Sequence, residues 1–213
     1  MLPETLTAGS DHPTRVVVHL PGWGDRAAKH LDLVTRLADD STAVVVAEPV
    51  MGEGRRRWYD VEDDGPRLDQ VASAVASVRA LLDDLVGRHS LTHADITLIG
   101  FSQGGALALA VATGADGGPR PGAVACLGGY LLARDELELG RVDGLPTLVA
   151  HGTDDEMIEP LRGRAAAKAL ARGSAVVQWS EVDGGHVLDG PLLTAASDWV
   201  AAVHRGQPPS TPL

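Results

Sequence analysis

The most constraining stretch of the sequence is GFSQGG at residues 100–105, because it joins two apolar segments of different character. Residues 95–99 are typical of a buried strand, and residues 106–112 are typical of a buried helix. Ser102 therefore occupies a sharp strand-to-helix turn, and the glycines two positions before and after it leave room for a strained backbone. The N-terminus of the helix favours negative charge that develops beside the serine hydroxyl.

A glycine-rich strand-to-helix turn can also cradle a phosphate, so a phosphate-binding loop is the alternative for residues 100–105. These residues, however, have neither the Gly-Lys-Ser/Thr ending of a P-loop nor the G-x-G-x-x-G spacing of a dinucleotide site. The pattern G-x-S-x-G favours a nucleophilic serine that performs acyl transfer. Such a serine needs a base and an acid from elsewhere in the chain.

Apolar runs and helical periodicity alternate along the 213 residues. The expected strands cover residues 15–20, 42–47, 95–99, 123–127, 146–152 and 175–179, and the expected helices cover residues 26–40, 65–87, 106–112, 161–171 and 190–203. Because parallel strands need crossover helices, this alternation predicts an α/β fold with a mostly parallel sheet and helices on both faces. We expect one domain over residues 1–206 and a disordered, proline-rich tail over residues 207–213.

The charge balance restricts the partners of the chain. A formal net charge of −11 would repel nucleic acid and anionic membrane surfaces. Residues 1–14 lack the pattern of a signal peptide, and no apolar run is long enough to span a membrane. We therefore expect no nucleic-acid partner, no membrane insertion and a cytoplasmic location. The one cysteine, Cys126, lies in an apolar stretch that predicts a buried structural thiol.

His186 is the best candidate for the base. It follows the last expected strand after two glycines, and a histidine can take the serine proton and return it to the leaving group. His19 and His151 lie in or at the ends of strands, which predicts buried packing residues, and the other five histidines lie in tails, helices or helix-end loops. A Gly-Gly-His stretch alone is more typical of a solvated loop, and the serine upstream is what favours catalysis.

Two adjacent aspartates, Asp154 and Asp155, follow the strand at residues 146–152. A carboxylate at this place completes the order Ser, Asp, His, and it would hold the histidine in the right tautomer. An acidic pair in a loop is also typical of capping or of a solvated surface. The residues alone leave the choice between the two aspartates open.

Four stretches together resemble those of a known family. They are PGWGD at residues 21–25, similar to H-G-x-G-D; WYD at residues 58–60, similar to W-F/Y-D; GFSQGG at residues 100–105; and HGTDD at residues 151–155, similar to H-G-x-x-D. On these motifs, which span nearly the whole chain, the protein resembles the phospholipase/carboxylesterase group of α/β-hydrolases. That group includes small bacterial carboxylesterases and acyl-protein thioesterases.

The resemblance implies an α/β-hydrolase fold with little or no lid. It implies that Ser102 is the nucleophile, that Asp155 is the acid because it ends H-G-x-x-D, and that His186 is the base. It also implies that Trp23 and Gln103 donate backbone N–H groups to the oxyanion. The role of Gln103 follows from mechanism as well, since the residue after the nucleophile is placed to make this bond.

The chain departs from the family pattern at three positions. Pro21 replaces the usual histidine before the oxyanion glycine, and Glu156 and Glu159 replace prolines that commonly follow the acid. These changes could reshape the mouth of the pocket without removing a group that the chemistry needs. Candidate pocket residues are Trp58, Tyr59, Tyr130 and Met157, each of which could equally belong to the core.

The sequence thus predicts a serine hydrolase that cleaves carboxylic esters or thioesters through an acyl-Ser102 intermediate, with no metal and no organic cofactor. A dienelactone-hydrolase-like enzyme is a second reading, although that group resembles this fold with cysteine as the nucleophile. A hydrolase-fold protein that binds small molecules without turnover is a third, because the fold does not guarantee activity. The expected partner is a small-molecule ester or thioester, and the oligomeric state is open, a homodimer included.

Overall fold

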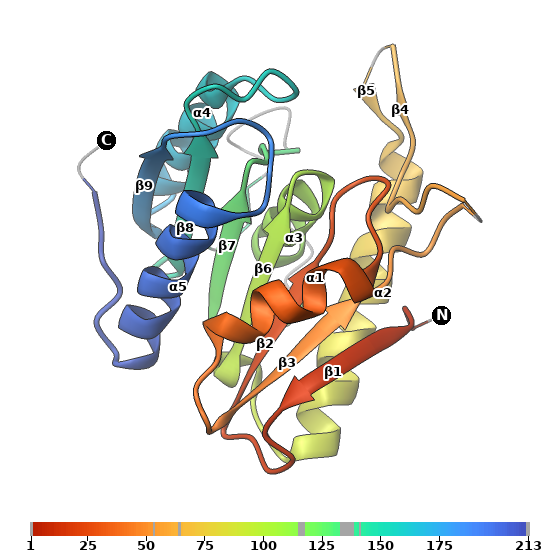
Figure 1. The fold of residues 1–213 in the computed structure, drawn as a ribbon, viewed down its shortest axis with the longest axis vertical. Helices are drawn as coiled ribbons and strands as arrows, with labels where there is room; N and C mark the ends of the chain where they lie inside the picture. Colours follow the sequence, from red (N-terminus) through yellow and green to blue (C-terminus); the bar gives the residue numbers. More distant parts are fainter. Residues whose placement is uncertain are drawn as a thin grey trace.

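A central sheet dominates the computed structural model, which describes residues 2–52, 54–63, 65–114, 118–132, 139–140 and 142–211 (Figure 1). Within these residues the main sheet has seven strands in the order β1-β3-β2-β6-β7-β8-β9. The strands are β1 (Thr5–Gly9), β2 (Arg15–Leu20), β3 (Thr42–Ala47), β6 (Ile96–Phe101), β7 (Ala123–Leu127), β8 (Pro146–Gly152) and β9 (Val176–Val182). Among the seven strands of this sheet only β1 pairs antiparallel, which confirms the predicted mostly parallel sheet.

Helices cover both faces of the sheet, as predicted. They are α1 (Ala27–Val34), α2 (Leu68–His89), α3 (Gln103–Thr113), α4 (Pro160–Arg172) and α5 (Gly190–His204). The apolar side chains of α1 and α5 pack into one core cluster, and those of α2, α3 and α4 pack into a second cluster on the opposite face. Figure 1 shows α1 and α5 in front of the strands.

The structure differs from the sequence prediction in three local features. β1 lies in the polar lead-in, where we expected no strand; most of its side chains are exposed, so its position depends on pairing with β3. The helix expected over residues 26–40 ends at Val34 and continues as a 3₁₀ turn over Thr35–Leu37, where the Thr35 hydroxyl donates to the carbonyl of Leu31. The two short strands β4 (Val61–Glu62) and β5 (Gly65–Pro66) form a separate hairpin.

The C-terminal segment also differs from a free tail. Thr211 donates its backbone N–H to the carbonyl of Val177 at 2.8 Å, so residues 207–211 return to the outer edge of β9. Residues 212–213 of the expected tail lie outside the described residues.

The carboxyl ends of β2, β6, β7 and β8 meet at one edge of the sheet, because these neighbouring strands run parallel (Figure 1). The GFSQGG stretch turns there from β6 into α3 with its glycines in close contact. A β-carbon added to Gly104 would lie 2.0 Å from the carbonyl oxygen of Leu20, and one added to Gly100 would lie 2.0 Å from the carbonyl oxygen of Gly104. Helix α3 can approach β2 and β6 only without these β-carbons.

We therefore expect Gly104→Ala to lower the free energy of unfolding by about 3 kcal/mol or more, since backbone must move to admit the new methyl group. The control is Gly87→Ala in α2, where an added β-carbon meets nothing within 4 Å. Alanine there should raise stability by roughly 0.5–1 kcal/mol through helix propensity. Urea denaturation of both variants measures the difference, and equal stabilities would contradict the close packing of α3.

Candidate active site

Ser102 lies at the turn between β6 and α3 with φ 55° and ψ −119°. The left-handed region is costly for a residue with a β-carbon, and such strain is typical of a functional turn. The turn is held by a hydrogen bond from the Ser102 N–H to the carbonyl of Leu127 at 2.8 Å. Gly22 approaches it closely, since a β-carbon there would lie 3.1 Å from Cβ of Ser102.

His186 and Asp155 lie next to this serine. Nε2 of His186 is 2.8 Å from Oγ of Ser102, and Nδ1 of His186 is 2.7 Å from Oδ2 of Asp155. Because the carboxylate can only accept, Nδ1 carries the proton, and Nε2 is left to accept from the serine hydroxyl. The three side chains thus form one chain of hydrogen bonds across 84 residues of sequence.

The structure separates the two aspartates that the sequence left open. Asp155 is 5% exposed, and its Oδ1 accepts backbone N–H groups from Met157 at 3.0 Å and Ile158 at 2.8 Å. Asp154 is exposed, and no hydrogen bond to His186 is found for it among the described residues. The buried carboxylate is therefore fully supplied with donors, as a buried charge requires.

His151, which the sequence predicts to be a buried packing residue, also donates to Asp155. Its Nε2 is 2.8 Å from the carbonyl of Ile158 and 3.1 Å from Oδ2 of Asp155, so this nitrogen carries the proton. Burial lowers the pKa of His151, which keeps the ring neutral. The spacing of four residues to Asp155 in H-G-x-x-D was the available sequence signal.

The two candidate oxyanion donors come from different elements. Trp23 lies in the loop after β2 and is 51% exposed, and Gln103 is the first residue of α3. The Gln103 side chain accepts from the Trp58 N–H at 2.9 Å and donates to the carbonyl of Tyr59 at 2.7 Å. The Trp58 indole N–H donates to the carbonyl of Pro21 at 2.8 Å. Trp58 thus connects the start of α3 to the loop that carries Trp23.

This connection corrects the expectation that Trp58 and Tyr59 line the pocket. Both side chains are fully buried in the core, and neither belongs to the cavity wall. Their two hydrogen bonds to Gln103 could not be inferred from the WYD motif, because the partner is 44 or 45 residues away.

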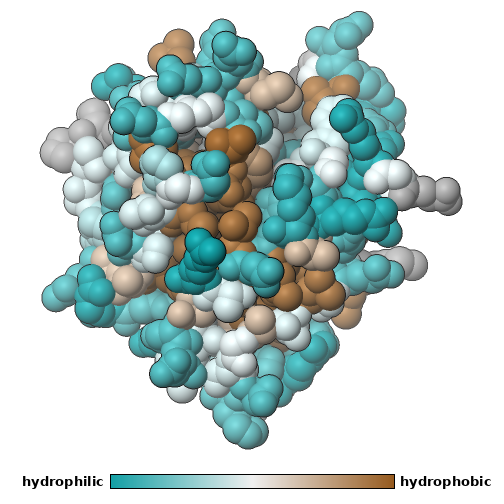
Figure 2. Space-filling view, in the orientation of Figure 1, coloured by the Kyte–Doolittle hydropathy of each residue, from teal (hydrophilic) through white to brown (hydrophobic). Residues whose placement is uncertain are grey.

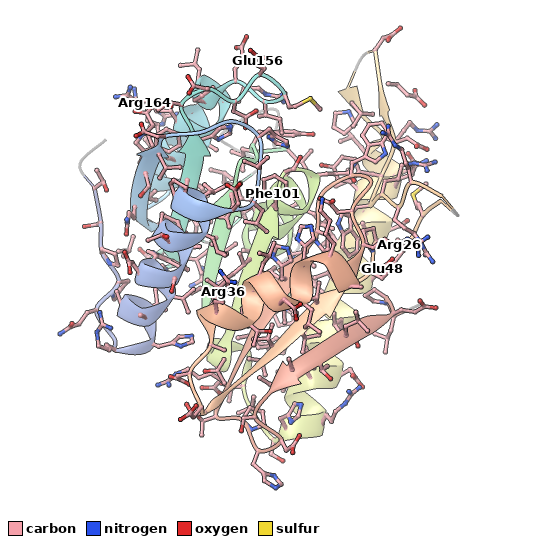
Figure 3. All side chains as sticks on the ribbon, viewed as in Figure 1. Arg26, Arg36, Glu48, Phe101, Glu156 and Arg164 are labelled. Carbon is pink, nitrogen blue, oxygen red and sulfur yellow. The ribbon has the colours of Figure 1, made fainter. Side chains whose placement is uncertain are left out.

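A cavity of about 830 Å³ opens beside Ser102 and His186, and Tyr130 and Met157 lie on its wall. Its apolar lining includes Trp23, Leu33, Phe101, Met157, Ile158 and Leu188. Figure 2 shows apolar side chains gathered in the middle of this face within a hydrophilic surround, and Figure 3 places Phe101 in the same central region. Of the three departures from the family pattern, Pro21 is buried and Glu156 and Glu159 are exposed; none of them lines the cavity.

A second polar cluster, made of His19, His30 and Asp25, lies at this cavity, and His30 and Asp25 are part of its wall. Nε2 of His19 is 2.8 Å from Nδ1 of His30, and Nε2 of His30 is 3.2 Å from Oδ2 of Asp25. Burial raises the pKa of Asp25, but hydrogen bonds from His30 and Lys29 outweigh burial and lower this pKa to about 2. Burial lowers the pKa of His19, which is fully enclosed. Asp25 is therefore a fixed charge that ties the end of the Trp23 loop to α1.

Comparisons with known proteins identify the family of the chain. A family model described as Phospholipase/Carboxylesterase matches residues 3–204. The chain belongs to this family. It is therefore a hydrolase of the phospholipase/carboxylesterase family with an α/β-hydrolase fold.

Solved structures share the fold at low sequence identity. Esterase PE8 is 24% identical, with a TM-score of 0.80 over 97% of this chain and 98% of its own. A Bacillus cereus carboxylesterase is 18% identical, with a TM-score of 0.82 over 93% of both chains. A Mesorhizobium loti carboxylesterase is 23% identical, with a TM-score of 0.76 over 88% of both chains. Each match covers most of the compared chain, so the likeness concerns the whole fold.

Among the described residues, no group of three or more His, Cys, Asp or Glu side chains is placed to hold a metal ion. No helix in that part of the chain combines the length and apolarity needed to cross a bilayer.

Proposed function

We propose that the protein is a serine hydrolase that cleaves carboxylic esters or thioesters, with Ser102, His186 and Asp155 as its catalytic triad. The observation that carries this proposal is the pair of hydrogen bonds that joins the three side chains, at 2.8 Å and 2.7 Å. We also propose that it works as one domain over residues 1–206 in a reducing compartment such as the cytoplasm, where its single cysteine stays reduced.

In the first half of the reaction, Oγ of Ser102 attacks the carbonyl carbon of the substrate while Nε2 of His186 takes the serine proton. The backbone N–H groups of Trp23 and Gln103 bind the oxyanion, and the N-terminus of α3 adds favourable potential there. Asp155 stabilises the imidazolium. His186 then gives the proton to the leaving alcohol or thiol, and the acyl group stays on Ser102.

In the second half, a water molecule attacks the acyl-Ser102 carbonyl and His186 takes a proton from it. The tetrahedral intermediate collapses, the carboxylic acid leaves, and the proton returns to Oγ of Ser102. The apolar wall of the cavity, which includes Leu33, Phe101 and Leu188, suits the hydrocarbon part of an ester.

The test is covalent labelling together with turnover. We expect a fluorophosphonate probe to label the intact protein once, at Ser102, and p-nitrophenyl acyl esters of increasing chain length to be hydrolysed, with labelled protein inactive. Peptide mass spectrometry locates the label. Cys126 should stay unlabelled, because burial raises the pKa of its thiol to about 12 and it remains protonated inside the sheet.

The same experiment decides between the alternatives. A binding protein without turnover would hydrolyse no ester of any length and would carry no adduct on Ser102. A dienelactone-hydrolase-like enzyme would prefer lactones, added as a further set of substrates, to open-chain esters. Matched thioester substrates with the same acyl groups measure the preference between ester and thioester.

A further inference from the structure

Arg162 lies in the first turn of α4 and on the wall of the cavity. Its guanidinium carbon is 4.0 Å from the centroid of the Tyr130 ring, within the range of a cation–π contact. Several other cations have carboxylate partners, among them Lys29 with Asp25 and Arg67 with Glu62 and Asp69. Within the described residues, Arg162 forms no ion pair with a carboxylate. Its guanidinium also donates no hydrogen bond to any of the described residues, so these donors are available to a ligand.

Tyr130 adds a second donor at the same place. Its hydroxyl is 3.4 Å from the hydroxyl of Tyr59, which is fully buried behind it. Burial raises the pKa of Tyr59 well above its ordinary value, so this phenol keeps its proton. When Tyr59 donates to the Tyr130 oxygen, the Tyr130 hydroxyl is left to donate into the cavity.

The backbone connects this pair of donors to the triad. Tyr130 follows Gly128 and Gly129 at the end of β7, and a β-carbon on Gly129 would lie 2.9 Å from the Ser102 carbonyl oxygen. A β-carbon on Gly128 would lie 3.6 Å from Oδ2 of Asp155 and from Cε1 of His186. A ligand group held by Arg162 and Tyr130 would therefore lie in the same cavity as Ser102 and His186.

We propose that Arg162 and the Tyr130 hydroxyl bind a carboxylate carried by the substrate, in its acyl part or in its leaving group. This inference rests on the proposed function and specifies the substrate class. The planar fork of a guanidinium matches a carboxylate, and the aromatic ring beneath it limits the orientations of the arginine. The net charge of the chain is −11, yet the arginine on the wall of this cavity pairs with no carboxylate of the described residues. The overall field would otherwise repel an anion.

The experiment compares esters that differ only in one charge. p-Nitrophenyl half-esters of adipic, pimelic and suberic acid are paired with the straight-chain p-nitrophenyl esters of the same carbon number. A second pair, m-carboxyphenyl hexanoate and m-carbamoylphenyl hexanoate, moves the charge to the leaving group. In at least one pair, we expect Arg162→Gln to lower the ratio of kcat/KM for the charged ester to that for the neutral ester about tenfold. Tyr130→Phe should lower it less, because the ring under Arg162 remains.

Arg164→Gln is the matched control, because Arg164 lies two residues further along α4, does not line the cavity and points outward, away from Phe101 (Figure 3). It should leave the ratio and the neutral rate unchanged. Added salt should lower the charged-ester preference of the intact protein but not its neutral rate. If neutral esters are hydrolysed and Arg162→Gln leaves every ratio unchanged, this inference is wrong while the proposed function stands. If no ester is hydrolysed, the proposed function itself has failed.

Discussion

Ser102→Ala is expected to lower kcat for p-nitrophenyl esters by roughly 10⁵–10⁶-fold, because it removes the atom that would form the acyl intermediate. Alanine keeps the β-carbon, so the strained backbone at φ 55° and the packing against Gly22 are unchanged. The variant should therefore unfold at the same temperature as the parent. Steady-state turnover and a thermal melt measure the two expectations.

Ser77→Ala serves as the control for a lost hydroxyl, since Ser77 lies on α2, away from the cavity, and its hydroxyl donates to the carbonyl of Ser73. It should retain full turnover. A Ser102→Ala protein that still hydrolyses esters within tenfold of the parent would exclude an acyl-Ser102 intermediate.

Asp155→Asn is expected to lower kcat by about 10⁴-fold, the scale found when a triad carboxylate becomes an amide. The amide oxygen can still accept the backbone N–H groups of Met157 and Ile158, so the loop after β8 should keep its shape. The amide NH₂ would then face Nδ1 of His186 and the protonated Nε2 of His151. An NH₂ group cannot accept the hydrogen bonds that these two nitrogens donate to the carboxylate. His186 would be driven to the wrong tautomer.

Asp154→Asn makes the same chemical change one residue away, on an exposed side chain. It should change kcat less than twofold, with KM unchanged. Parallel kinetics of the two variants test the assignment of the acid, and equal losses in both would mean that the loss comes from loop disturbance instead of from the missing carboxylate.

The sequence predicts the sheet and its helices well where burial is continuous. β2, β3, β6, β7 and β8 are buried over most of their length, so their apolar runs identify them. β1 has no such run, because three of its five residues are exposed and its position is decided by β3. Strand assignment from sequence therefore fails where pairing, and not burial, holds the strand.

The candidate site likewise contains some residues that the sequence predicts and others that it does not. Ser102 is predictable because the turn needs glycines at fixed offsets, and these are visible in the sequence. In the sequence, only the H-G-x-x-D motif favours Asp155 over Asp154. The physical basis of this choice is the burial of Asp155 beside His186 and His151, which is visible only in the structure. The hydrogen bonds of Gln103 to residues 58 and 59, and the position of Arg162 over Tyr130, depend on tertiary contacts that leave no local pattern.

The contact of residues 207–211 with β9 affects whether two copies of this protein can associate through the edge of the sheet. The outer edge of a terminal strand offers unpaired backbone groups that recruit strands from other molecules. Here the carbonyl of Val177 accepts the Thr211 N–H, and the carbonyl of Trp179 accepts the Thr211 hydroxyl at 3.4 Å. Two successive outward-facing acceptors of β9 are thus occupied by the chain itself. Self-association by continuing the sheet past β9 would first have to displace this segment.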